Sequence, residues 1–336
     1  MTHVVDTLGR PLRDLRISVT DRCNFRCTYC MPKEVFGSDF AFMPRGELLH
    51  YGEIALVARA AASLGMRKVR ITGGEPLLRK ELEWLIRGLR EIDGVDDIAL
   101  TTNGSALPQK AQLLAEAGLD RVTVSLDSLD EATFQEINDV AFPVARVLEG
   151  IDAAIEAGLA PVKINMVVKR GVNDQDVLPM VRHFQGKPVV LRFIEFMDVG
   201  TTNGWRLEDV VPAGELFQTI AEAHALAPVA PSYAGEVARR FHVEGDPLEL
   251  GFISSVTQPF CTDCHRARLS ADGKLYTCLF ASEGHDLKTL IREGADEDVI
   301  RGHLVRIWTG RGDRYSELRS DATQDLPKVE MSYIGG

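Results

Sequence analysis

Short apolar runs typical of β-strands alternate with amphipathic helical stretches between residues 12 and 195. The chain has six strand candidates, at residues 12–20, 69–72, 98–102, 121–125, 162–168 and 189–195. Helical patterns separate them, at residues 47–64, 80–92, 107–117, 145–157 and 176–184. A regular alternation of strand and helix predicts a parallel sheet, either doubly wound or curled into a barrel.

Polar residues directly follow most of these strands, and this favours the barrel. They lie at 20–22, 72–75, 101–104, 125–127 and Glu195. In a barrel the carboxyl ends of the strands converge on one mouth, where barrel enzymes hold their catalytic residues. The pattern stops after Val199, and residues 221–234 are rich in alanine and proline. We therefore expect an α/β barrel over residues 1–230 and a smaller second region over residues 231–336.

Composition and charge narrow the class of protein. The chain has 336 residues, 45% of them hydrophobic and 26% charged, which is ordinary globular usage. Its net charge of −11 argues against a broad nucleic-acid or anionic-membrane surface. No stretch approaches the roughly 18 apolar residues of a membrane helix, and residues 1–10 lack a signal-peptide pattern. We expect a cytoplasmic enzyme that binds neither nucleic acid nor membranes.

All six cysteines lie in two groups separated by a long interval. The groups are Cys23, Cys27 and Cys30, and Cys261, Cys264 and Cys278. Disulfides are disfavoured in a reducing cytosol, where closely spaced cysteines more often hold metal. Three thiolates are one too few for a [4Fe–4S] cluster, so each group would leave one iron open. The alternative is structural zinc, which His265 could complete at the second group but no local residue completes at the first.

The motifs around these cysteines resemble those of known enzymes. The C-x3-C-x2-C spacing, with Tyr29 before the last cysteine, and the GGEP segment at residues 73–76 resemble the radical S-adenosylmethionine superfamily. Residues 15–23, 261–268 and 331–336 resemble the GTP 3′,8-cyclase family within it, over nearly the whole chain.

The resemblance implies a fold, cofactors and a reaction. The fold would be a partial (β/α)6 TIM-type barrel with a C-terminal iron–sulfur cluster region. The cofactors would be two [4Fe–4S] clusters and S-adenosylmethionine, which yields a 5′-deoxyadenosyl radical. That radical would take hydrogen from C3′ of GTP, and C3′ would then attack C8. The product would be (8S)-3′,8-cyclo-7,8-dihydroguanosine 5′-triphosphate, in the first step of molybdenum cofactor biosynthesis.

The resemblance also implies roles for individual residues, beginning with all six cysteines as iron ligands. The predicted S-adenosylmethionine contacts are Tyr29, Gly74, Ser125 and Met197. The predicted GTP contacts are Arg16, Lys68, Arg70, Thr101, Lys163, Arg192, Arg266 and Arg268. The predicted catalytic residues are Arg266, Arg268 and the terminal Gly335 and Gly336.

The cations support this assignment on physical grounds. A triphosphate needs several cationic donors in one place, and basic residues within apolar strands are costly to bury unpaired. Any one of them could instead form a core ion pair with Glu195 or Asp127.

Two other functions remain open at this point. One is a radical S-adenosylmethionine maturase acting on a peptide, and the other is a non-catalytic iron–sulfur electron carrier. The expected partners of a cyclase are a small reductase or a flavodoxin- or ferredoxin-like electron donor, and the downstream cyclic pyranopterin monophosphate synthase. A homodimer is also possible.

Overall fold

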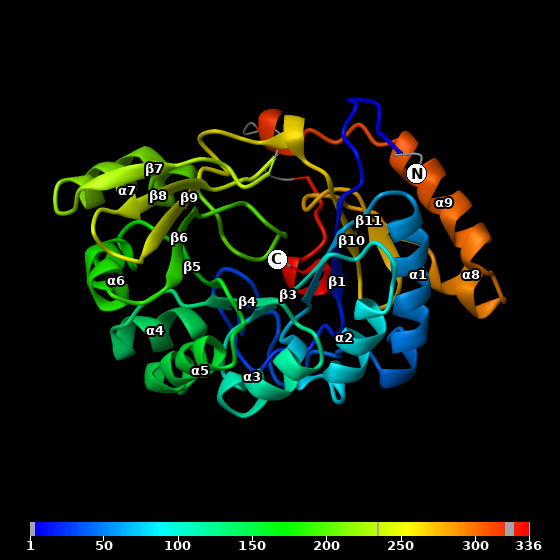
Figure 1. Cartoon of the computed structure of the whole chain (residues 1–336), viewed down its shortest axis with the longest axis horizontal. Helices are drawn as coiled ribbons and strands as arrows, with labels where there is room; N and C mark the ends of the chain where they lie inside the picture. The colour runs from blue at the N-terminus through cyan, green and yellow to red at the C-terminus, as the bar shows by residue number, and fades with distance from the viewer. Residues whose placement is uncertain (1–3, 234, 320–325, 336) are drawn as a thin grey trace.

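The computed structural model describes residues 4–233, 235–319 and 326–335, and within them twelve strands form one open sheet. The six predicted strands lie in chain order at its centre and pair in parallel. They are β1 (Asp14–Ser18), β2 (Lys68–Thr72), β3 (Asp97–Thr102), β4 (Arg121–Ser125), β5 (Val162–Val168) and β6 (Val189–Glu195). The sheet is curved and does not close, which confirms the predicted partial barrel (Figure 1).

Helices cover the convex side of this curved sheet (Figure 1). The five predicted helices are α1 (Tyr51–Ser63), α2 (Leu82–Arg90), α3 (Leu107–Glu116), α5 (Val144–Glu156) and α6 (Val177–Phe184). A further helix, α4 (Glu131–Asn138), was not predicted from the sequence. Short 3-10 helices lie at Arg45–Glu47, Pro76–Leu78, Asp174–Asp176, Leu207–Asp209, Cys261–Asp263 and Tyr315–Glu317.

Residues from 226 onward add strands to both ends of the same sheet. At one end β9 (Glu249–Ile253) pairs in parallel with β6, followed by antiparallel β8 (Arg239–Val243) and β7 (Leu226–Val229). At the other end β10 (Arg266–Leu269) pairs in parallel with β1, followed by antiparallel β11 (Lys274–Tyr276) and β12 (His285–Asp286). The other α-helices within the described residues are α7 (Ala213–Ala221), α8 (Lys288–Arg292), α9 (Glu297–Thr309) and α11 (Met331–Ile334). The division at residue 230 stays a prediction.

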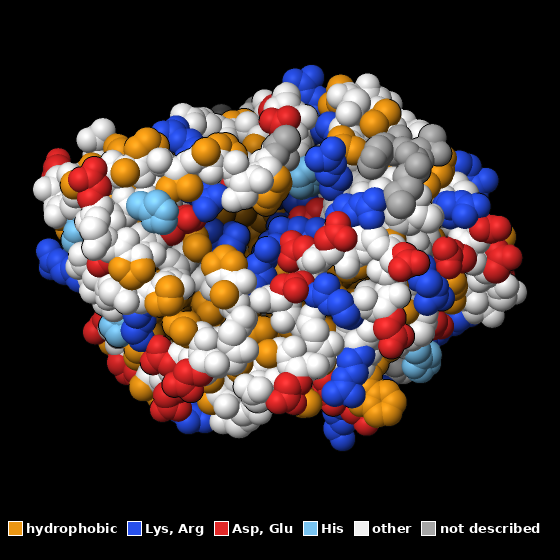
Figure 2. Space-filling view, in the orientation of Figure 1, with side chains coloured by type: hydrophobic (Ala, Val, Ile, Leu, Met, Phe, Trp, Pro, Cys, Tyr) orange, Lys and Arg blue, Asp and Glu red, His pale blue; other side chains and the backbone are white. Residues whose placement is uncertain are grey.

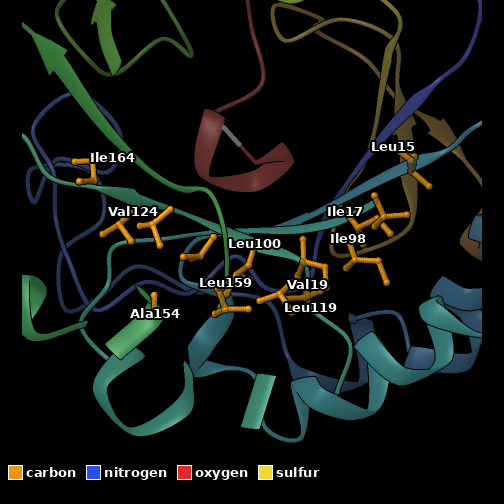
Figure 3. Packing of buried hydrophobic residues seen from close by; sticks show 14 of the residues in the cluster. Leu15, Ile17, Val19, Ile98, Leu100, Leu119, Val124, Ala154, Leu159 and Ile164 are labelled. Carbon is orange, nitrogen blue, oxygen red and sulfur yellow. The ribbon is translucent and has the colours of Figure 1, made fainter. Parts of the chain in front are cut away.

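The two faces of the sheet differ in chemistry because successive side chains of a strand point to opposite sides. Apolar residues such as Leu15, Ile17 and Leu100 are buried against the helices (Figure 3). The alternate positions, such as Arg16 and Arg70, face the concave side. The interior of an ordinary TIM barrel is filled by branched apolar side chains. In this protein charged side chains line the concave side instead, and the cavity between them could hold a polar ligand.

Among residues 4–233, 235–319 and 326–335, no helix combines the length and apolarity needed to cross a bilayer.

Candidate active site

A large cavity occupies the concave side of the sheet, and Lys and Arg side chains gather in the hollow at the centre of the face shown in Figure 2. Most of the predicted site residues line it: Arg16, Tyr29, Arg70, Thr101, Ser125, Lys163, Arg192, Met197, Cys261, Cys264, Arg266, Arg268 and Cys278. Its lining does not include Lys68, Gly74, Gly335, Cys23, Cys27 or Cys30. Gly336 lies outside the described residues.

Three arginines form a row across neighbouring strands of the cavity wall. Arg268 on β10 pairs in register with Arg16 on β1, which pairs in register with Arg70 on β2. Adjacent strands are about 4.8 Å apart, so the three side chains leave the sheet at one level and on one side. The buried Nε atoms of Arg16 and Arg70 have no hydrogen-bond partner, and the same holds for Arg192 on β6. Unpaired buried cations are costly, so this wall is suited to an anionic ligand.

Burial lowers the pKa values of three of the predicted GTP-contact residues, Arg192, Lys163 and Lys68. Burial, followed by repulsion from Arg70, lowers the pKa of Arg192 to about 9. Burial, followed by the nearby Arg192, lowers the pKa of Lys163 to about 7. Burial also lowers the pKa of Lys68 to about 8, and its Nζ lies 3.7 Å from Asp97. A polyanion in the cavity would favour the charged forms of all these groups.

Glu195 and Asp127, the two acids considered as alternative partners for the cations, are engaged elsewhere. Glu195 accepts hydrogen bonds from the backbone N–H groups of Ala213 and Val256, at 2.8 and 2.7 Å. Asp127 accepts one from the Tyr29 hydroxyl at 2.7 Å and one from the Val167 N–H at 2.8 Å. Neither carboxylate neutralises the arginine row.

The loop that carries Cys23, Cys27 and Cys30 follows β1 and packs against the loop after β2. The Gly74 N–H donates to the Thr20 carbonyl at 2.7 Å, and the Glu75 N–H donates to the Arg22 carbonyl at 2.8 Å. A Cβ on Gly74 would overlap the backbone of Asp21 and Arg22. The glycine is therefore required for the two loops to pack this closely.

Glu75 completes this packing by joining the loop after β2 to the end of β3. Its buried carboxylate accepts hydrogen bonds from the Thr102 hydroxyl at 2.7 Å and from the Asn103 N–H at 2.8 Å. Burial raises the pKa of Glu75 to about 6, although these hydrogen bonds lower it. Asn103 in turn points its amide at Cys23 Sγ, at 3.8 Å.

The three thiols of this loop lie close enough to influence one another's ionisation. Burial raises the pKa of Cys23 to about 11 and also raises the pKa values of Cys27 and Cys30, with a contribution from neighbouring thiolates. In the described part of the chain, no three His, Cys, Asp or Glu side chains are grouped around a single metal ion. Cys23 Sγ accepts a hydrogen bond from the Phe25 N–H at 3.4 Å. Three sulfur donors with N–H groups directed at sulfur fit an iron–sulfur cluster.

The second cysteine trio, Cys261, Cys264 and Cys278, lies at the amino end of the parallel strands, opposite the loop that carries the first trio. Cys264 directly precedes β10, and Cys278 follows the antiparallel β11, so both lie near the amino end of β10. Because β10 runs parallel to β1, and Cys23 follows the carboxyl end of β1, the two trios flank the concave side from opposite ends. Burial would raise the pKa of Cys264, but the guanidinium groups of Arg266 and Arg311 lower it to about 6. Cys264 is therefore readily available as a thiolate ligand.

The C-terminal segment enters the concave side of the sheet (Figure 1). Ile334 is fully buried, and the Gly335 carbonyl accepts a hydrogen bond from the Arg268 guanidinium. A Cβ on Gly335 would collide with the Thr72 side chain. Residue 335 therefore has to be glycine. Its hydrogen bond with Arg268 places the C-terminal tail beside the arginine row.

Several cavity residues were not identified from the sequence, among them Asp14, Asn165 and Tyr233. Strand alternation could have found two of them. Asp14 lies two positions before Arg16, and Asn165 two positions after Lys163, so each shares a face with a predicted ligand residue.

Comparisons with known proteins define the class first. Residues 17–184 match the family model for the Radical SAM superfamily, and residues 189–317 match the model for Molybdenum Cofactor Synthesis C. The open barrel with its three-cysteine loop is that of a radical S-adenosylmethionine enzyme, a class that uses a [4Fe–4S] cluster and S-adenosylmethionine. The structure of Streptococcus suis SuiB bound to S-adenosylmethionine shares the fold, with a TM-score of 0.59 and 14% identity over 90% of this chain and 65% of that chain.

Full-length relatives then narrow the class to one family. A GTP 3′,8-cyclase of Acidothermus cellulolyticus is 51% identical, over 98% of this chain and 98% of the relative. A GTP 3′,8-cyclase of Staphylococcus epidermidis is 49% identical, over 99% of each chain. This chain belongs to the GTP 3′,8-cyclase family.

Proposed function

We propose that this chain converts GTP to (8S)-3′,8-cyclo-7,8-dihydroguanosine 5′-triphosphate, the first step of molybdenum cofactor biosynthesis. The observation that carries the proposal is the row of Arg268, Arg16 and Arg70, placed in one cavity between two cysteine trios. Such a row suits a triphosphate, because guanidinium groups form short, strong bonds to phosphate oxygens.

The first trio would hold the cluster that binds S-adenosylmethionine. Its three thiolates leave one iron open, and the S-adenosylmethionine contacts would be Tyr29, Gly74, Ser125 and Met197. When bound, the cluster and S-adenosylmethionine supply the radical chemistry that removes hydrogen from C3′ of the ribose. Asp127 fixes the Tyr29 hydroxyl at 2.7 Å and so sets the direction of this ring toward the cavity.

The second trio would hold another [4Fe–4S] cluster, whose open iron would bind the guanine base. The triphosphate would lie against Arg16, Lys68, Arg70, Thr101, Lys163, Arg192, Arg266 and Arg268. Fixing the base and the triphosphate at separate points would bring C3′ and C8 together. The free energy of binding would then offset part of the entropic cost of the activation barrier. Gly335 and Gly336 would contribute from the tail, since Arg268 already holds the Gly335 carbonyl.

We further propose the surroundings in which this enzyme works. A small reductase or a flavodoxin- or ferredoxin-like protein would donate the electron, and a cyclic pyranopterin monophosphate synthase would take the product. The location would be the cytoplasm, and a homodimer is the proposed assembly.

Substitution of Arg268 tests the substrate assignment. Arg268→Ala removes a buried guanidinium from the row, and charged hydrogen bonds contribute about 1.5–3 kcal/mol each, so GTP binding should weaken by roughly 10- to 100-fold. Calorimetry under anaerobic conditions measures this, with Arg87→Ala on the exposed side of α2 as the control. Unchanged GTP affinity, with 5′-deoxyadenosine released on a peptide instead, would favour a peptide maturase. No 5′-deoxyadenosine under any condition would favour an electron carrier.

A further inference from the structure

Asp6 and Arg10, near the start of the described residues, contact Arg311 beside the second cysteine trio. Asp6, Arg10 and Arg311 are all buried, with 6%, 3% and 4% of their surfaces exposed. Asp6 Oδ2 accepts hydrogen bonds from Arg10 Nε at 2.6 Å and from Arg311 Nη1 at 3.0 Å. One carboxylate thus joins two guanidinium groups that are 301 positions apart in the chain (311 − 10).

Both guanidinium groups reach the segments that carry the cysteines. Arg10 Nη1 donates to the Cys261 carbonyl at 2.6 Å. Arg311 donates from Nη1 to the Cys264 carbonyl at 2.7 Å and from Nε to the Thr277 carbonyl, next to Cys278, at 3.1 Å. The group formed by Asp6, Arg10 and Arg311 therefore connects all three cysteine segments.

Arg311 also contacts a ligand atom directly. Its Nη2 donates to Cys264 Sγ at 3.2 Å, and its guanidinium carbon lies 4.6 Å from the centre of the Trp308 ring. The Trp308 indole N–H donates to the Arg10 carbonyl at 2.9 Å, so Trp308 links Arg311 to Arg10 a second time. This arrangement holds the Arg311 side chain in one direction. A cation that donates to a thiolate sulfur favours the more negative, reduced state of the cluster that the sulfur binds.

We propose that the Asp6, Arg10 and Arg311 group positions the second cysteine trio, and that Arg311, through its N–H···S bond to Cys264, raises the reduction potential of the cluster held there. These are positioning residues, because none of them would touch GTP or an iron atom. The inference rests on the second cluster of the proposed function.

The test measures the midpoint potential of the second cluster in a protein from which the first cysteine trio has been removed. In a Cys23→Ala, Cys27→Ala, Cys30→Ala background, the protein is reconstituted anaerobically, iron and sulfide are counted, and a dithionite titration is followed by electron paramagnetic resonance. Arg311→Lys keeps a positive charge near Asp6 but cannot make all of the guanidinium bonds. At the midpoint potential of the background protein, we expect the ratio of reduced to oxidised cluster to fall about tenfold, a shift of about 59 mV to lower potential for a one-electron couple. The exposed Arg306→Gln on α9 is the matched control and should leave the midpoint unchanged.

The outcomes separate this inference from the proposed function. A background protein that takes up no iron would overturn the second cluster itself. A background protein with a full cluster, and a midpoint that Arg311→Lys does not move, would overturn the inference alone.

If Arg311→Lys loses the parent's circular dichroism spectrum, Arg10→Lys decides instead, because it removes the bond to the Cys261 carbonyl without touching sulfur. There the inference predicts less iron per chain at an unchanged midpoint, and full iron retention would contradict it.

Discussion

At the scale of single residues, the site depends on cations placed where a barrel normally has apolar side chains. Arg16, Arg70 and Lys163 could be recognised in the sequence because they interrupt otherwise apolar strands. The sequence could not show that Glu195 is unavailable to them, because its carboxylate is bound by the backbone N–H groups of Ala213, the first residue of α7, and of Val256, which follows β9. The hydrogen bonds of this glutamate thus remove one candidate counter-charge for the arginine row.

Lys163 should make GTP binding depend on pH. Burial lowers its pKa to about 7, so above that pH the free protein carries it mainly as the neutral amine. A bound triphosphate favours the charged amine, so binding takes up a proton and affinity falls as pH rises, by up to about tenfold per pH unit.

Calorimetry in two buffers of different ionisation enthalpy, at about pH 8, should report this proton uptake. Lys163→Arg, which stays charged across this range, should reduce both the uptake and the slope, leaving the part due to Lys68, whose pKa burial lowers to about 8. An equal slope in the two proteins would show that another group is responsible.

At the scale of elements, loops that carry the chemistry are held by backbone packing and by buried ion pairs. The loop after β6 illustrates the second device. Asp198 in this loop is buried, and its carboxylate accepts hydrogen bonds from Tyr315 at 2.6 Å, Arg319 at 2.9 Å and Lys328 at 3.1 Å. These bonds attach the segment before α11 to the loop that contains Met197.

Gly74→Ala should displace the first cysteine loop. The new Cβ would overlap the backbone before Cys23, and overpacking of this kind costs about 1–3 kcal/mol. We expect a lower melting temperature and less iron retained by the first trio.

Gly88→Ala on α2 is the matched control, since a Cβ there meets nothing within 4 Å. Replacing a helical glycine by alanine should stabilise the protein by roughly 0.5–1 kcal/mol. If both variants keep the wild-type iron content, the close packing of the two loops is not what holds the cysteines.

Asp198→Asn should release the tail. The amide keeps the shape of the carboxylate but leaves Lys328 and Arg319 without their buried counter-charge, which costs about 3–5 kcal/mol. Hydrogen exchange at the amides of residues 329–335 should become markedly faster.

The control for this variant is Glu208→Gln, which removes an exposed ion pair with Arg206. Tail exchange should stay at the wild-type rate there, because exposed pairs contribute little. Slow tail exchange in Asp198→Asn would mean that Ile334 and Gly335 suffice to anchor α11.

At the scale of the whole molecule, the sequence predicts the central sheet well and its two ends poorly. Strands β4, β5 and β6 have the predicted bounds, because each is an apolar run closed by polar residues. The strands β9 and β10 were not predicted. Their parallel pairing with β6 and β1 depends on residues far away in the chain. That pairing sets the second trio opposite the first, which no local pattern reveals.

We propose that both cysteine trios serve one reaction, from opposite ends of the concave side of the sheet. The most direct measurement is anaerobic turnover with GTP, S-adenosylmethionine and reductant, in the wild-type chain and in two variants that each replace one cysteine trio by alanine. We expect 5′-deoxyadenosine and cyclised GTP from the wild type, neither from the first-trio variant, and no cyclised GTP from the second-trio variant. Cyclised GTP from either variant would contradict it.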